Sequence, residues 1–373
     1  MVGTAALAAP VASMCRPISQ APRRWEGWQA LKSISLSDDG RMIDHSQRDL
    51  RTTSEGQSYA MFLALVDNDI DLFDRILEWT QNNLAGGDMA SRLPAWLWGQ
   101  HSNAEKWDVL DPNPASDADL WLAYNLLEAA RLWKRADLGR IGEGLLAQVR
   151  MREVVELPGL GTMLLPGPQG FDERGYWRLN PSYLPLPVLR RFAALDAGGP
   201  WQALAGNTVR MLVESAPHGF VPNWIAWQPS YFFTDPVRGP IGSYDAIRVY
   251  LWLGMTDPQD PGARQSLSAL HGPLDLLSRR DMVAETVNCR TGEAEGKGPY
   301  GFHAALLPYL KAQDEIGLAA KLRGGLPTPA QQRATEPAYY SHMLSLFGAG
   351  WYDGRFRFAP DGRLLPAWNG ARP

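Results

Sequence analysis

From about residue 24 onward, hydrophobic residues recur every three or four positions, which is the spacing of one face of an α-helix. The pattern predicts a series of helices joined by loops rich in glycine, proline and tryptophan. They are expected at 25–31, 55–66, 73–84, 120–130, 138–149, 182–195, 200–214, 247–251, 267–274, 302–310 and 340–347. Strand signals are few: a short one at 41–44, and a hairpin over 356–365 that turns at 360–362.

Two kinds of helix alternate along the chain. One kind begins in polar or aromatic residues near positions 55, 117, 182, 244, 300 and 340, and the other is plainly amphipathic and begins near 70, 138, 200, 264 and 314. This alternation predicts an all-α fold of two concentric helix rings, whose inner helices present their N-terminal ends to one face. No composition shift marks a domain boundary, so we expect a single barrel-like domain over 23–373.

The first 22 residues differ from the rest of the chain. Positions 2–13 are small and apolar and resemble the back half of a secretory signal with a small-residue cleavage site, although the basic beginning of such a signal is missing. We therefore expect export to the periplasm or the cell exterior. This stretch is too short to span a membrane, and no later window is long enough, so no membrane span is expected.

Composition narrows the class of ligand. The formal net charge of the 373 residues is -4, which gives no basic surface for nucleic acid. Fifteen Trp accompany 12 Tyr and 11 Phe, more indole than a core needs, and indole faces stack on the apolar faces of sugar rings. A carbohydrate cleft is the functional interpretation of this excess, and a tryptophan-rich core is the structural one.

Neither a metal nor a cofactor is expected. The two cysteines, Cys15 and Cys289, are far apart, one of them in the N-terminal segment, so a structural disulfide is not expected. The six histidines are scattered and form no cluster with metal-ligand spacing.

A first candidate for chemistry is Glu55, at the predicted start of a helix. Ser54 is expected to cap that helix, and Gly56 leaves space beside the carboxyl group. An acid held over cleared space suits protonation of a glycosidic bond. The alternative is an ordinary first-turn acid stabilised by the helix dipole.

A second cluster contains Asp117 and Asp119. Ser116 is a candidate N-cap, and Asp119, three residues later, fits a capping-box-like start. Asp117 has no structural role beyond the helix dipole, so its carboxylate is a candidate for pointing into a cleft.

A third cluster contains Asp245 and Arg248, three residues apart and therefore on one helix face. A neighbouring arginine keeps a carboxylate ionised, which suits a general base. The alternative is a surface ion pair that contributes a few tenths of a kcal/mol.

Four segments resemble the glycoside hydrolases of family 8, with the closest likeness to the periplasmic endoglucanases encoded beside bacterial cellulose synthase. They are 54–59 (SEGQSY), 115–124 (ASDADLWLAY), 179–185 (LNPSYLP) and 243–250 (SYDAIRVY). The resemblance runs in order from about 24 to 350, and the second segment, continued through Ala129 and Trp133, is its most specific part. It implies an (α/α)6 barrel, an inverting mechanism and β-1,4-glucan as substrate.

The resemblance also implies roles for single residues. Glu55 matches the general acid, Asp245 the general base, Asp117 the acid that hydrogen-bonds the sugar at the cleavage point, and Arg248 the partner of the base. Tyr183 is the candidate for a tyrosine at the cleavage subsite, and Trp96, Trp98 and Trp177 are candidates for stacking on sugar rings. One of Tyr339 and Tyr340 is expected to line the catalytic centre, with Tyr340 preferred. The sequence departs from the family pattern at two places. Asn223 stands where the pattern has Asp, and residues 108–114, which precede the second segment, differ from it.

The expected activity is an endo-β-1,4-glucanase, a cellulase linked to bacterial cellulose biosynthesis. Its expected partners are a glucan chain and, functionally, a cellulose synthase complex, with the enzyme acting as a monomer. A chitosanase or xylanase of the same family remains an alternative, as does a non-catalytic glucan-binding assembly factor. A polysaccharide lyase on a similar barrel is disfavoured by the Glu–Asp constellation.

One physical problem accompanies this assignment. A general acid must be protonated, but the start of a helix favours the anion. Burial or a neighbouring carboxylate must overrule the dipole at Glu55, and Asp117 is the neighbour we expect to do so.

Overall fold

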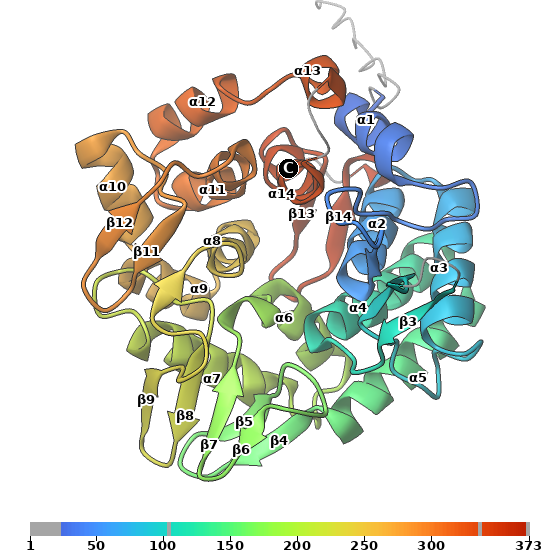
Figure 1. Cartoon of the computed structure of the whole chain (residues 1–373), viewed down its shortest axis with the longest axis horizontal. Helices are drawn as coiled ribbons and strands as arrows, with labels where there is room; N and C mark the ends of the chain where they lie inside the picture. Colours follow the sequence, from blue (N-terminus) through green and yellow to red (C-terminus); the bar gives the residue numbers. More distant parts are fainter. Residues whose placement is uncertain (1–23, 103–105, 335–337, 371–373) are drawn as a thin grey trace, which may run out of the picture.

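The computed structural model describes residues 24–102, 106–334 and 338–370, so the N-terminal segment 1–22 and its expected signal lie outside the described residues. Figure 1 shows two concentric rings of helices. The inner helices are α2 (Ser54–Val66), α4 (Ser116–Trp133), α6 (Leu186–Leu195), α8 (Ala246–Met255), α11 (Tyr300–Ala312) and α14 (Tyr339–Tyr352). The outer helices are α1 (Glu26–Ser35), α3 (Ile70–Leu84), α5 (Ala136–Arg152), α7 (Trp201–Glu214), α9 (Pro261–Ala269) and α12 (Ile316–Gly324), and α10 (Gly272–Arg280) and α13 (Pro329–Ala334) lie beside them.

This arrangement confirms the all-α, two-ring prediction, and burial explains it. Every residue of α8 is buried, because an inner helix packs on all sides. In α5 only four residues along one face are buried: Leu138, Gly142, Leu145 and Val149. The alternation of two helix types in the sequence is therefore the alternation of inner and outer positions.

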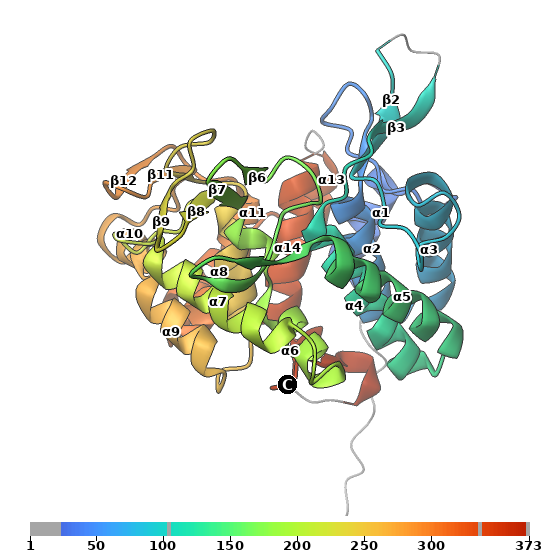
Figure 2. The same ribbon diagram turned by 90° about the horizontal axis from the view of Figure 1, so that it is seen from below.

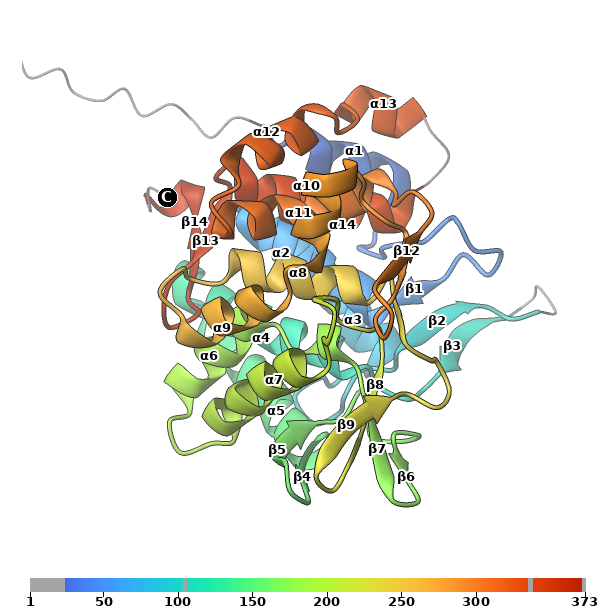
Figure 3. The ribbon, with the colours of Figure 1, turned by 90° about the vertical axis from the view of Figure 1, so that its left-hand side faces the viewer.

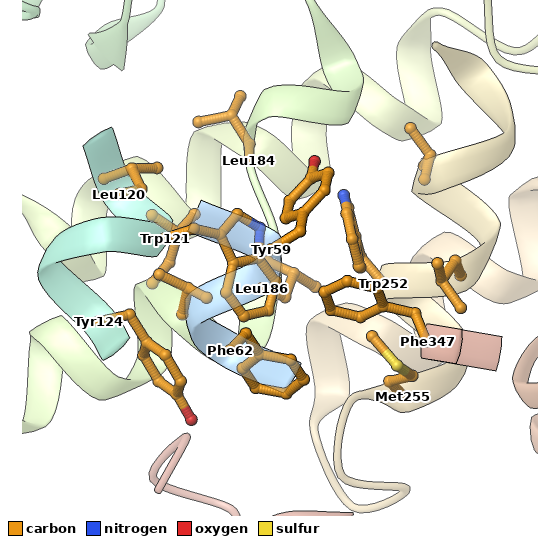
Figure 4. Packing of buried hydrophobic residues seen from close by; sticks show 14 of the residues in the cluster. Tyr59, Phe62, Leu120, Trp121, Tyr124, Leu184, Leu186, Trp252, Met255 and Phe347 are labelled. Atoms are coloured by element: carbon orange, nitrogen blue, oxygen red, sulfur yellow. The ribbon is translucent and has the colours of Figure 1, made fainter. Parts of the chain in front are cut away.

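Aromatic side chains from different inner helices fill the centre of the barrel (Figure 4). Phe62 of α2 stacks on Phe347 of α14 with ring centroids 5.0 Å apart. Trp121 of α4 lies 5.4 Å from Trp252 of α8. Much of the tryptophan excess thus belongs to the core, as the structural interpretation anticipated.

Short antiparallel strands lie in the loops between helices. The first sheet contains β1 (Thr52–Thr53), β2 (Leu97–Gln100) and β3 (Trp107–Asp111). The second sheet contains β6 (Asp172–Glu173), β7 (Tyr176–Leu179), β8 (Ile225–Gln228) and β9 (Tyr231–Thr234). The third sheet contains β10 (Ile241–Gly242), β11 (Thr286–Asn288) and β12 (Glu293–Glu295). The hairpins are β4 (Val154–Leu157) with β5 (Gly161–Leu164), and β13 (Phe356–Phe358) with β14 (Leu364–Pro366). Two short 3-10 helices are Pro181–Tyr183 and Ala367–Asn369. Figures 2 and 3 show the three sheets on one side of the barrel and the β13–β14 hairpin on the other.

The structure corrects several local predictions. The hairpin at 356–365 is confirmed, with Gly362 at φ 74° in its turn. Instead of a strand at 41–44 there is an isolated bridge between Leu36 and Met42. The other strands were missed because they are two to five residues long, too short for a period-two pattern to stand out. The pattern at 267–274 covers parts of two helices, α9 and α10.

None of the helices in the described ranges has both the length and the apolar character needed to cross a membrane.

Candidate active site

Glu55 lies in the first turn of α2, at the end of the barrel that carries the three sheets (Figure 3). The capping residue is Thr53 rather than Ser54: the Thr53 hydroxyl accepts a hydrogen bond from the Gly56 N–H at 3.1 Å. Thr53 is the better placed because its extended backbone, paired in β1, allows its side chain to reach back over the helix end. The cap therefore leaves Ser54 buried at the site, with its hydroxyl 3.4 Å from Glu55 Oε2.

The pairing of β1 with β2 brings Trp96 to the acid. The Ser54 N–H donates to the Trp96 carbonyl at 2.9 Å. In return, the Trp96 indole Nε1–H donates to Glu55 Oε1 at 3.1 Å. One short sheet thus fixes the position of the carboxyl group and supplies an aromatic face beside it.

Gly56 is required by a close approach. A methyl group at this position would lie far inside van der Waals contact of the Tyr339 hydroxyl, which comes from the start of α14. The space that the sequence analysis expected beside Glu55 is therefore occupied by a tyrosine.

Asp117 lies in the first turn of α4 and is 1% exposed. Its Oδ1 accepts the Ala118 N–H at 2.9 Å, and its Oδ2 lies 3.7 Å from Arg248 Nη2. Within the described ranges, no N–H or hydroxyl group donates to Oδ2 although that atom is buried. Buried acceptors without a donor mark places where a ligand hydroxyl can bind.

Asp119 does not close a capping box. The N-cap of α4 is Ala115, which makes no side-chain cap, and the Ser116 hydroxyl is buried without a protein partner in the described residues. Asp119 instead lies against Glu153, the residue that follows α5 as its C-cap. The predicted cap was wrong because sequence spacing cannot show which way a buried side chain points.

Asp245 immediately precedes α8, and its side chain is 33% exposed, unlike that of Asp117. Arg248 Nη2 lies 3.3 Å from Asp245 Oδ1 and donates to the Ser182 hydroxyl at 2.8 Å. Because Arg248 is buried, this is not a surface ion pair, and its guanidinium stands between two acids.

Asn223 supports the backbone around Asp245. Its Oδ1 accepts the N–H of Ser243 at 2.8 Å and of Ala246 at 2.9 Å. A carboxylate oxygen would accept the same two bonds, so asparagine keeps the support and adds no charge beside Asp245. The departure from the family pattern therefore preserves this loop.

Both tyrosines at the start of α14 adjoin the centre. Tyr340 donates its hydroxyl to the Tyr244 carbonyl at 2.6 Å and contacts Arg248. Tyr339 lies over Gly56 beside Glu55. Tyr183 lies in the 3-10 helix before α6, with its ring 5.8 Å from the Arg248 guanidinium. Both of the candidate tyrosines, Tyr339 and Tyr340, thus lie beside the acidic residues.

A cleft of about 620 Å³ opens beside these residues. Its lining includes Trp96, Phe171, Tyr183, Asn223, Trp224 and Asp245. Trp224 was not singled out from the sequence, yet its ring is stacked on Phe171 at 5.7 Å and 14° and lies 5.1 Å from the Arg178 guanidinium. The one feature of the sequence that could have indicated its place at the cleft is its position directly after Asn223.

The other two tryptophan candidates lie elsewhere. Trp98 is in β2, where it stacks on Trp107 with centroids 5.4 Å apart and lies 4.3 Å from the Arg41 guanidinium. Trp177 is in β7 opposite Trp227 and packs against the hydrophobic core. In the described residues, neither Trp98 nor Trp177 forms a hydrogen bond with Glu55 or Asp245.

Burial is the main cause that raises the pKa of Glu55, and the negative charge of Asp245 adds to it. Hydrogen bonds from the backbone and Trp96, and the charge of Arg248, act in the opposite direction. The pKa of Asp117 is raised well above its usual range by burial and then by Glu55. The expectation that Asp117 keeps the proton on Glu55 is therefore corrected: desolvation is the main cause, and the neighbouring acid that adds to it is Asp245.

No group of His, Cys, Asp and Glu suited to a metal ion occurs in residues 24–102, 106–334 and 338–370. Cys289 is a buried thiol, and Cys15 lies outside the described residues.

A helical barrel in which one carboxyl group is bonded to a tryptophan that lines a cleft, and a second carboxyl group lines the same cleft beside an arginine, is the arrangement of a glycoside hydrolase. The family described as "Glycosyl hydrolases family 8" matches residues 5–354, so the chain belongs to glycosyl hydrolase family 8.

Three relatives are close in sequence or structure. An endoglucanase of Xanthomonas axonopodis pv. citri is 49% identical over 99% of this chain and 95% of its own length. An endoglucanase of Escherichia coli K12 is 45% identical over 94% of this chain and 93% of its own length. The crystal structure of an endo-1,4-D-glucanase from Vibrio fischeri is 38% identical, with a TM-score of 0.87 over 92% of this chain and 99% of that one.

Proposed function

We propose that this family 8 enzyme is an endo-β-1,4-glucanase that hydrolyses cellulose with inversion at the anomeric carbon. The observation that carries the proposal is that two acids in different surroundings adjoin one cleft. Desolvation raises the pKa of Glu55, which accepts a hydrogen bond from the cleft-lining Trp96, whereas Asp245 lines the cleft itself and pairs with Arg248. Inverting hydrolysis needs one protonated and one ionised carboxyl group, roughly 6.5–9.5 Å apart to admit a water molecule. The names of the relatives, all endoglucanases, support the substrate class.

In the proposed reaction, Glu55 gives its proton to the glycosidic oxygen as the bond from that oxygen to the anomeric carbon breaks. Asp245 takes a proton from a water molecule, whose oxygen bonds to the anomeric carbon from the opposite face. One water is consumed, one proton passes from Glu55 to the leaving hydroxyl, and one passes from water to Asp245. Exchange with solvent then restores both groups.

Asp117 is proposed to bind hydroxyl groups of the sugar at the cleavage point. Its buried Oδ2, which has no protein donor in the described ranges, supplies the acceptor. Trp96, Tyr183 and Tyr340 are proposed to contact the sugar ring, because they surround the same acids. Trp98 and Trp177 are proposed to bind more distant sugars.

The decisive experiment measures reducing ends released from carboxymethylcellulose, xylan and chitosan by the wild type and by Glu55→Gln. We expect the wild type to act on carboxymethylcellulose in preference to the other two, and the variant to bind it but turn over at least ~100-fold more slowly. The matched control is Glu78→Gln, an exposed position on α3, which should leave activity unchanged. Preference for xylan or chitosan would refute the substrate class, and binding without turnover by the wild type would favour an assembly factor.

We further propose that the enzyme works as a monomer in the periplasm or outside the cell, on cellulose made by a cellulose synthase complex. The small, apolar stretch at 2–13 supports export. Cell fractionation with sequencing of the mature N-terminus tests it, and an unprocessed cytoplasmic protein would contradict it.

A further inference from the structure

A second pair of carboxyl groups lies behind the active site. Asp119 follows Asp117 by two residues in α4 and therefore points away from the cleft. Glu153 is the C-cap that follows the outer helix α5, and its carbonyl accepts the Leu165 N–H at 2.9 Å. Both side chains have no exposed surface. The proposed reaction assigns neither of them a role.

The hydrogen bonding of this pair is incomplete unless it holds a proton. No N–H or hydroxyl group in the described ranges donates to any of the four carboxyl oxygens, all of which are buried. The two carboxyl groups instead lie against each other. Two carboxylates have no hydrogen to share, so one proton held between the two groups would supply the missing donor.

The surroundings favour retention of that proton. Burial acts first on both groups and raises both pKa values well above the usual range. The negative charges of Glu153, Asp117 and Glu55 add to the rise in the pKa of Asp119, and that of Asp117 adds to the rise in the pKa of Glu153. Glu153 also stands at the C-terminal end of a helix, which disfavours negative charge.

We propose that Asp119 and Glu153 share a proton, and that this contact positions the first turn of α4 and with it the sugar-binding carboxyl group of Asp117. If both carboxyl groups were ionised, their repulsion would separate the start of α4 from the end of α5. Asp117 lies in the same helical turn as Asp119, so it would move with that turn. The positioning role rests on the proposed glucan hydrolysis, whereas the shared proton does not.

The shared proton is tested without any substrate. A carboxyl group whose pKa is higher in the folded than in the unfolded state stabilises the protein at low pH, and this stability is lost as pH rises toward the folded pKa. One such proton changes the unfolding equilibrium constant by up to tenfold per pH unit. Unfolding by denaturant between pH 5 and 8 should show this slope in the wild type, and Asp119→Asn and Glu153→Gln should each reduce it. The control, exposed Glu156→Gln on the neighbouring strand, should keep it.

Infrared difference spectra provide a second measurement of the proton. The wild type at neutral pH should show the C=O band of a buried protonated carboxyl group, and the double variant Asp119→Asn/Glu153→Gln should lack the part due to this pair. Slopes and bands that match the wild type in all three variants would overturn the shared proton.

Positioning is tested by comparing an amide with a methyl group at one site. In Asp119→Asn the amide donates to Glu153 without a dissociable proton, so kcat on carboxymethylcellulose should stay within about threefold of the wild type. In Asp119→Ala, Glu153 loses its partner, and misplacement of Asp117 should lower kcat about 10- to 100-fold in protein that is still folded. A folded Asp119→Ala variant with wild-type kcat would overturn the positioning role. An equal collapse of kcat in Asp119→Asn would instead make Asp119 a reacting group and also overturn it.

Discussion

Replacing Gly56 with alanine tests how closely α14 is packed against the catalytic end of α2. The added methyl group would meet the Tyr339 hydroxyl well inside van der Waals contact, so the tyrosine must move. Such overpacking costs about 1–3 kcal/mol, offset by up to ~1 kcal/mol because alanine favours a helix more than glycine does. We therefore expect a net loss of about 1–2 kcal/mol in the free energy of unfolding, together with lower activity because Glu55 is adjacent.

A second substitution removes the clash. In Tyr339→Phe the hydroxyl is absent, and the next atom of that ring, Cζ, lies 3.6 Å from the added methyl group, an ordinary contact. Gly56→Ala should therefore be tolerated when it is combined with Tyr339→Phe. Denaturant unfolding of the wild type, both single variants and the double variant forms a double-mutant cycle. We expect a coupling free energy of about 1 kcal/mol or more, and a coupling near zero would refute the predicted contact.

Three further predictions concern the base, its support and the barrel closure. Asp245→Asn should abolish turnover while the wild type yields the α-anomer from β-glucan by NMR; a β-anomeric product would mean retention and exclude Asp245 as a base acting on water. Asn223→Ala should cost about 1–3 kcal/mol by denaturant unfolding because two backbone donors lose their acceptor, and Asn223→Asp should cost less. Glu128 is buried and accepts hydrogen bonds from Arg191 Nε at 2.6 Å and from the Leu364 N–H at 2.8 Å. Glu128→Ala should therefore cost roughly 3–5 kcal/mol in the free energy of unfolding, measured in the same way. The pH profile of activity should not change in the enzyme that remains folded.

The helix framework was predictable because the inner and outer helices leave different patterns in the sequence. Inner helices such as α8 are apolar all round and open in polar motifs, whereas α5 is apolar on one face only. These two patterns were enough to locate the starts of the inner helices and thus to bring Glu55, Asp117 and Asp245 to one end of the barrel.

The direction of each side chain was not predictable. Asp117 and Asp119 look equivalent as first-turn acids, yet one adjoins Arg248 and the other Glu153. The partners come from α8 and the end of α5, which are remote in sequence. The proton of Glu55 depends on burial by the assembled barrel, which a local motif does not contain. The same holds for Asn223, whose two hydrogen bonds reach across to another loop.

The role of Glu55 as a proton donor is tested most directly by changing how much the substrate needs the proton. Departure of a sugar hydroxyl requires protonation, whereas a 2,4-dinitrophenolate leaves without it. We expect Glu55→Gln to lose at least ~100-fold in kcat on carboxymethylcellulose but less than about tenfold on 2,4-dinitrophenyl β-cellooligosaccharides. Equal losses on both substrates, or near-wild-type turnover of carboxymethylcellulose, would contradict the assignment of Glu55 as the general acid.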